Sequence, residues 1–132
     1  MVDYKKQGKR NRAQGKAFEL RVRKELEDTG WIVDRWTNNI KDNKCVPAKA
    51  KWAGPGRPMM MGAGFPDFIA YREHTDGFAV EFIECKMNGY LDKVEKEKAK
   101  WYLECGYCSI FWIAYKVKEK NRVKVKYKGF TL

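Results

Sequence analysis

The sequence predicts a single domain of the mixed α/β class with the element order αβββαββ. Its 132 residues, 44% of them hydrophobic, match the size and apolar content of one domain. Two segments have the spacing of amphipathic helices, and the segments around them are rich in β-branched and aromatic residues. The second helix separates the third and fourth strands, so these two strands should be parallel. We therefore expect a mostly antiparallel central sheet with one parallel pair, flanked by helices.

The start of the chain is basic. Residues 1–12 have no apolar period, so they predict a mobile arm. Such an arm can hold a phosphate backbone, and it can equally be a solvated tail that only aids solubility. Together with a lysine in the following helix, its candidate nucleic-acid contacts are Lys5, Lys6, Lys9, Arg10, Arg12 and Lys16.

The first helix is predicted over residues 14–29. Its apolar residues Phe18, Val22 and Leu26 fall four apart and form a narrow stripe, and a glycine follows at position 30. Glu19 borders that stripe, so its carboxylate should lie between core and solvent. Taken alone, it reads as a structural residue that can pair with Arg23 one turn later.

Residues 31–36 are β-prone and predict the first strand, and regular structure is then expected to stop over residues 37–64. This long segment contains several prolines and glycines and is strongly basic, which is typical of a functional or disordered loop. A tryptophan among its lysines favours a surface that stacks a base and grips phosphates. The candidate contacts from the strand end and the loop are Arg35, Lys49, Lys51, Trp52 and Arg57.

The next two strands, predicted over residues 66–71 and 78–86, should form a hairpin. A turn centred between Thr75 and Asp76 makes Asp67 face Glu84, whereas a turn on Asp76 and Gly77 makes Asp67 face Lys86. Either register brings the two acids and the lysine close together.

Side chains alternate along a strand, so Glu84 and Lys86 share one face of it and Cys85 points away. Two carboxylates held side by side are costly unless a cation lies between them. Two acids and a lysine on neighbouring strands are the set that a metal-dependent phosphodiester hydrolase needs.

The remainder of the chain completes the sheet. A second helix is predicted between Gly89 and Gly106, and its apolar face is taken to be Leu91, Val94, Lys98, Trp101, Tyr102 and Cys105. Residues 109–115 are nearly continuous in apolar character, as expected of a central strand covered on both faces. The last strand is predicted where apolar residues alternate with lysines: Val123, Val125 and Tyr127 with Lys124, Lys126 and Lys128. This pattern favours a half-buried strand at an exposed edge of the sheet.

The net charge of +11 indicates a polyanionic partner, either nucleic acid or an acidic membrane surface. We favour nucleic acid, because the sequence has no long apolar run, secretory leader or lipidation motif. An intracellular location, in the cytoplasm or nucleoid, is expected. The four cysteines then read as buried free thiols, although Cys105 and Cys108 have the spacing of half a zinc site. His74 reads as a surface turn residue.

The motifs together resemble the PD-(D/E)XK nuclease superfamily. The resemblance covers residues 15–115: a helix with Glu19, a strand, Pro66-Asp67, then Glu84-x-Lys86 followed by a helix and a strand. The opening Gly15-Lys16-Ala17-Phe18-Glu19 is similar to that of archaeal Holliday junction resolvases. The segment 64–86 is also similar to the VRR-NUC branch of viral and bacterial repair and replication nucleases, so a virus or phage source fits.

The resemblance implies a restriction-endonuclease-like core and a DNA endonuclease of recombination, repair or replication. It implies Mg²⁺, replaceable by Mn²⁺, held by Asp67, Glu84 and the backbone carbonyl of Cys85. Lys86 would orient the attacking water or stabilise the transition state, and Glu19 would act through water or on a second metal ion. The substrate would be branched or double-stranded DNA and the active form a homodimer.

Two departures from these families keep other functions open. The resolvases usually have a short link where this chain has the long basic loop. The VRR-NUC branch would place a glutamine early in the second helix, where this chain has Glu95 or a neighbour. The alternatives are a VRR-NUC-type or restriction-like nuclease with another substrate structure, and a non-catalytic nucleic-acid-binding module.

Overall fold

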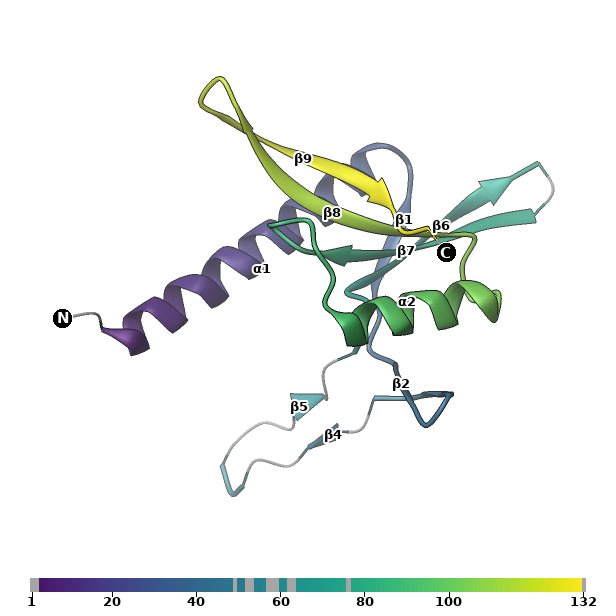
Figure 1. The fold of residues 1–132 in the computed structure, drawn as a ribbon, viewed down its shortest axis with the longest axis horizontal. Coiled ribbons are helices and arrows are strands. Elements are labelled where there is room, and N and C mark those ends of the chain that lie inside the picture. The colour runs from purple at the N-terminus through teal and green to yellow at the C-terminus, as the bar shows by residue number, and fades with distance from the viewer. Residues whose placement is uncertain are drawn as a thin grey trace.

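The structure, a computed structural model, describes residues 3–48, 50–51, 54–56, 60–61, 64–75 and 77–131. Its centre is a five-stranded sheet in the order β1-β6-β7-β8-β9 (Figure 1). The strands are β1 (Ile32–Arg35), β6 (Phe68–His74), β7 (Gly77–Cys85), β8 (Ile110–Glu119) and β9 (Arg122–Gly129). Only the β7–β8 pair is parallel. The predicted class, element order and parallel pair are therefore confirmed for the main sheet.

The first helix, α1 (Tyr4–Asp28), begins ten residues earlier than the predicted start at Gln14. The prediction of a mobile arm is wrong for Tyr4–Arg12, which is helical. The Asp3 side chain accepts hydrogen bonds from the backbone N–H groups of Lys5 and Lys6 and so caps the helix. Lysine, arginine, glutamine and alanine also favour helix without core contacts. These first turns extend beyond the sheet (Figure 1).

The two helices cover opposite faces of the sheet. Phe18 and Val22 of α1 are buried against Val33, Phe68 and Ile83, as the apolar stripe predicted. On the other face, α2 (Lys93–Glu104) packs against residues that include Phe82 and Phe111. Among the described residues, no helix is long and apolar enough to cross a membrane.

The inward face of α2 differs from the predicted one. Tyr102 is fully buried, as predicted, but Val94 is 57% exposed, Cys105 is exposed, and Ala99, which the prediction left out, is fully buried. The buried stripe therefore begins at Glu95 and not at Val94, a rotation of one residue around the helix. The helix consequently directs Glu95 toward the sheet.

The segment 37–64 is less irregular than predicted. It holds two small antiparallel ladders, one of β2 (Asn39–Lys41) with β3 (Lys44–Val46) and one of β4 (Ala50–Lys51) with β5 (Met60–Met61). The turn of the first ladder uses Asp42 and Asn43 at φ values of 52° and 58°, a conformation in which these residues are tolerated. The predicted contacts Lys49, Trp52 and Arg57 lie outside the described residues.

The β6–β7 hairpin has the first of the two predicted registers. Phe68 pairs with Ile83, and the strands are joined by a turn between His74 and Gly77. Asp67, one residue before β6, is therefore level with Glu84. The acidic strand ends meet because the turn fixes the register of the whole hairpin.

The β8–β9 hairpin forms one edge of the sheet. It turns through Lys120 and Asn121 at φ values of 47° and 64°. β8 has a neighbour on each side, but the middle strand is β7, and only the first half of β8 is buried. The predicted segment 109–115 is therefore part of an interior strand with buried side chains on both faces, as expected. β9 is an edge strand whose lysines are exposed, as predicted.

A buried tyrosine joins α2 to the segment before β6. The Tyr102 hydroxyl donates to the Phe65 carbonyl oxygen at 2.7 Å and accepts from the Trp36 indole nitrogen at 3.2 Å. Tyr102 is fully buried, so both partners depend on it for their hydrogen bonds. This contact holds the Phe65-Pro66-Asp67 segment against the core.

Replacing Tyr102 with phenylalanine should destabilise the protein by about 1–3 kcal/mol, because the Phe65 carbonyl and the Trp36 N–H would be left unpaired. Thermal unfolding should show a fall in Tm of roughly 4 °C per kcal/mol. Tyr71→Phe is the matched control, since it removes an exposed hydrogen bond to Asp34 and should change Tm little. Equal shifts in the two variants would contradict the role given to Tyr102.

Candidate active site

The backbone around Asp67 is fixed from both sides. Its carbonyl oxygen accepts from the Trp36 N–H at 3.0 Å, and its Oδ2 accepts from the Cys85 N–H at 2.8 Å. Gly64, at the start of the segment, lies against the Thr37 backbone so closely that a Cβ would approach the Thr37 carbonyl carbon to 2.4 Å. Only glycine fits there without a shift of the chain. The acid is therefore held in place by its own neighbours and by β7.

Glu84 is 6% exposed, and among the described residues it is the only buried charged side chain. Burial raises the pKa of its carboxyl group, and the hydrogen bond and negative charge of Asp67 raise it further. The hydrogen bond with Glu95 adds to the increase, and only the charge of Lys86 opposes it. Asp67 and Glu84 are therefore adjacent carboxyl groups that are costly to ionise together.

Lys86 lies beside this pair. Its Nζ is 2.7 Å from an oxygen of Glu95 and 3.8 Å from Glu84 Oε2. Burial disfavours the charged form of Lys86, but the hydrogen bond with Glu95 and the charges of Glu84, Glu95 and Asp67 outweigh burial and raise its pKa. The ammonium group is thus kept positively charged at the edge of the acidic pair.

Glu95 is a site residue to which the sequence analysis gave no role. One of its carboxylate oxygens accepts from the Asp92 N–H at 3.0 Å, while the Asp92 side chain accepts from the Glu95 N–H at 2.8 Å. This capping box begins α2, and the other oxygen of Glu95 pairs with Lys86. The D-x-x-E pattern at 92–95 could have located Glu95 in the first turn, but not its contact with Lys86.

Glu19 reaches the site from α1. It lines a groove of about 370 Å³ with Gly15, Phe18, Cys85, Lys86, Met87 and Asn88. Burial raises the pKa of Glu19, as does the charge of Asp67, while Arg35 and Lys16 lower it. The predicted pairing of Glu19 with Arg23 is wrong, because Arg23 pairs with Glu27 at 3.4 Å and donates to the Val33 carbonyl.

The Cys85 side chain faces α1, on the side of β7 opposite to Glu84 and Lys86, as the alternation predicted. Burial raises the pKa of its thiol, and the charges of Asp67, Glu19 and Glu84 raise it further. The thiol of Cys85 is therefore expected to stay protonated at neutral pH. All four cysteines are free thiols, as expected, but the expectation that they are buried is wrong for Cys105, which is exposed.

The candidate metal donors at this strand end are the adjacent carboxyl groups of Asp67 and Glu84. Over the described ranges, no group of three or more His, Cys, Asp or Glu side chains is close enough to hold a metal ion. Magnesium typically binds one or two carboxylates and keeps several waters, whereas calcium takes six to eight oxygens and structural zinc takes four protein ligands.

The other predicted nucleic-acid contacts are spread over several elements. Lys5, Lys6, Lys9, Arg10 and Arg12 lie on the first turns of α1, far along the helix from Glu19. Lys16 and Arg35 are close enough to Glu19 to lower its pKa. Lys51 belongs to β4, which pairs with β5 away from the main sheet (Figure 1).

Comparison of the chain with models of protein families, with curated proteins and with solved structures gives no match.

Replacing Glu84 with glutamine should stabilise the protein in EDTA at neutral and alkaline pH. The folded pKa of Glu84 is raised above its ordinary value of 4.5, so the folded state binds the proton more tightly than the unfolded state. The contribution of Glu84 to stability is therefore complete below about pH 4.5 and falls as the pH rises toward the folded pKa. Glutamine does not titrate, so the stability of the variant relative to wild type should increase from about pH 5 to about pH 8. The increase in the free energy of unfolding should be about 1–3 kcal/mol.

Thermal unfolding of both proteins across that pH range measures the effect. Glu104→Gln, which changes an exposed acid on α2, is the control and should show no comparable trend. A Tm difference between wild type and Glu84→Gln that stays constant with pH would contradict the raised pKa.

Proposed function

We propose that this protein is a magnesium-dependent endonuclease that hydrolyses phosphodiester bonds in DNA, on a core of the PD-(D/E)XK type. The observation that carries the proposal is the burial of Glu84 beside Asp67, with Lys86 at 3.8 Å. Two adjacent acids that are costly to ionise without a cation lower the stability of the fold, so a purely structural role does not explain them. Such perturbed groups cluster at functional sites.

Asp67, Glu84 and the backbone carbonyl of Cys85 would hold the cation, which Mn²⁺ can replace. When bound, the cation would supply positive charge to the phosphate and lower the pKa of a water molecule. Asp67 is already held by the Cys85 N–H, so little reorganisation is needed on binding. The net charge of +11 would attract DNA to the protein as a whole.

Lys86 would act on the scissile phosphate or on the attacking water as a fixed positive charge. Its pairing with Glu95 fixes the long side chain in one position, and an ammonium oriented in advance stabilises developing negative charge most effectively. Glu95 is therefore a positioning residue. Glu19, across the end of β7, would assist through water or a second cation.

The DNA would contact α1 as well as the acidic site. The first turns of α1 carry a run of basic residues beyond the edge of the sheet, and Lys16 and Arg35 lie near Glu19. Contacts of this kind give affinity for the phosphate backbone without sequence preference. Cleavage of a four-way junction would further require a two-fold homodimer with two active sites.

Asp67→Asn should lower DNA cleavage by several orders of magnitude and leave DNA binding unchanged or tighter, because the substitution removes a metal ligand and a charge that repels phosphate. Nicking of a supercoiled plasmid in Mg²⁺, with binding measured in EDTA, checks this. Asp42→Asn is the charge-matched control. Asp42 lies in the β2–β3 turn at a φ of 52°, where asparagine is equally tolerated, so this variant should keep full activity.

The same assay separates the other functions. Binding without cleavage in Mg²⁺ or Mn²⁺ by the wild-type protein would indicate a non-catalytic nucleic-acid-binding module. Paired symmetric nicks on a synthetic four-way junction, with no cleavage of the plasmid, would indicate a junction resolvase.

Glu95→Gln should lower the rate of cleavage about tenfold while the fold is retained. Glutamine can keep the capping box at the start of α2, but it cannot pair its charge with Lys86. The expected loss is in kcat rather than KM, because Lys86 would be mispositioned for the reaction and not for binding. Full activity of Glu95→Gln with an unchanged Tm would exclude a positioning role.

A further inference from the structure

The exposed face of β9 carries a row of cations that the proposed mechanism does not use. Arg122, Lys124, Lys126 and Lys128 alternate with half-buried residues, so they project from one face of the strand. Successive members are about 6.7 Å apart along the strand. This step is comparable to the spacing of neighbouring phosphates in an extended nucleic-acid strand.

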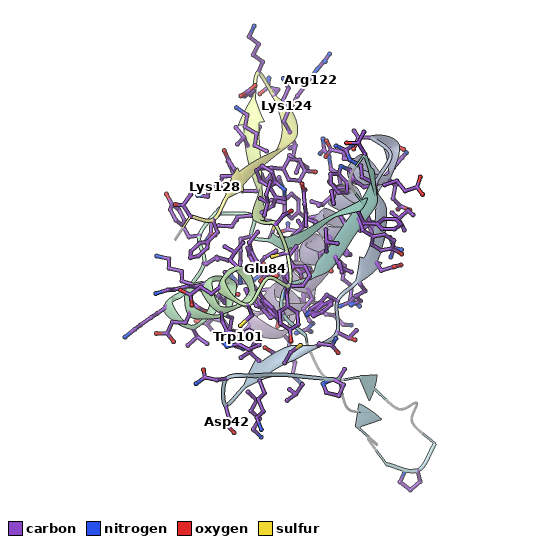
Figure 2. All side chains as sticks on the ribbon, turned by 90° about the vertical axis from the view of Figure 1, so that its right-hand side faces the viewer. Asp42, Glu84, Trp101, Arg122, Lys124 and Lys128 are labelled. Atoms are coloured by element: carbon purple, nitrogen blue, oxygen red, sulfur yellow. The ribbon has the colours of Figure 1, made fainter. Side chains whose placement is uncertain are left out.

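The sheet register connects this row to the acidic site. Glu84 is level with Ile113 on β8, and Ile113 is level with Lys128 on β9. Glu84 and Lys128 are thus two strand spacings apart, about 10 Å between Cα atoms. From Lys128 the row runs toward the tip of the β8–β9 hairpin, beyond the end of β7 at which the acids lie. Figure 2 shows Lys128 nearer to Glu84 and the side chains of Lys124 and Arg122 near the tip.

Two tyrosines accompany the first cation of the row. The Lys128 ammonium lies 4.7 Å from the centre of the Tyr90 ring and 5.3 Å from that of Tyr115. Tyr90 is 72% exposed, so most of its ring is open to solvent. The loop that carries Tyr90 begins at Lys86, where the Gly89 N–H donates to the Lys86 carbonyl oxygen at 2.7 Å. The aromatic group and the site lysine therefore belong to one short loop.

The far end of the row borders a shallow hollow of about 660 Å³. It is lined by Glu119, Lys120, Arg122 and Lys124. Glu119 pairs with Lys126 at 2.9 Å and with Lys124 at 3.4 Å, so one acid partly neutralises the middle of the row. An excess of positive charge remains at both ends.

We propose that the exposed face of β9, together with Tyr90 and Tyr115, binds a single-stranded segment of nucleic acid that leads away from the cleavage site. The lysines would follow the phosphates, and the exposed Tyr90 ring would stack on an unpaired base. Duplex bases are already stacked on one another and cannot reach a tyrosine ring, which is why the occupant is single-stranded. The proposal rests on the proposed nuclease function, which defines where the DNA is cut. The preferred substrate would then be DNA that has unpaired nucleotides next to the cleaved bond.

Binding in EDTA tests the surface without any cleavage, so its result is independent of catalysis. The probes are a fluorescently labelled oligothymidylate and a blunt duplex of the same length, with anisotropy read over a series of salt concentrations. Lys126→Ala with Lys128→Ala should weaken oligothymidylate binding on the order of tenfold and reduce the salt slope by about 1.4. The matched control is Lys116→Ala with Lys118→Ala, which removes the same charge from the opposite face of the hairpin and should weaken binding about twofold or less.

Two single substitutions separate stacking from charge. Tyr90→Ala should weaken oligothymidylate binding at least about fivefold, and Tyr90→Phe should keep it, because the ring and not the hydroxyl stacks. Glu119→Gln should tighten binding, since it frees Lys124 and Lys126 for phosphate. Circular dichroism confirms that each variant is folded.

Three results would overturn the proposal. The first is an equal loss of oligothymidylate affinity in the two double lysine variants, and the second is wild-type oligothymidylate affinity in Tyr90→Ala. The third is a wild-type protein that binds the duplex more tightly than the oligothymidylate. Binding to anionic lipid vesicles that depends on the same lysines, without oligothymidylate binding, would assign the surface to a membrane instead. Failure of plasmid nicking, with the single-strand results as expected, would contradict the nuclease function alone.

Discussion

Glu84 is buried beside Asp67 at the end of β7, at a cost in stability that the core on both faces of the sheet must offset. Glu84 is 6% exposed, so water does not stabilise the charged form of its carboxyl group. The negative charge of Asp67 destabilises that form further. Lys86 offsets only part of this cost, because its shorter contact is with Glu95. Functional sites commonly give up stability for binding or catalysis in this way, which is why we propose a function for this pair.

Contacts from the sheet and from both helices hold the backbone around Asp67 and Glu84 in place. The parallel β7–β8 pair places the end of β7 inside the sheet, and the two helices cover it from opposite faces. Tyr102 holds the segment before Asp67 from the α2 side, and Glu95 holds Lys86. Each helix thus supplies the site with one acid, Glu19 from α1 and Glu95 from α2, in addition to its share of the core.

The sequence predicted those features that are determined locally. The hairpin and its two possible registers followed from turn chemistry, and the structure has the first of them. The parallel pair followed from the crossover through a helix. Features that depend on tertiary packing could not be predicted. The buried face of α2 was misplaced because Val94 is apolar yet exposed, while Glu95 is polar yet turned inward to reach Lys86. The early turns of α1 were missed because they form by capping and propensity without an apolar pattern.

We propose that Asp67 and Glu84 hold a divalent cation together. The most direct test is a crystal structure of the wild-type protein grown with Mn²⁺, with anomalous differences measured at the manganese absorption edge. We expect one strong peak in contact with a carboxylate oxygen of each acid, at about 2.0–2.2 Å, and with the Cys85 carbonyl oxygen. A manganese peak elsewhere, or an intact direct contact between the two carboxyl groups in saturating Mn²⁺ with no peak beside them, would contradict it.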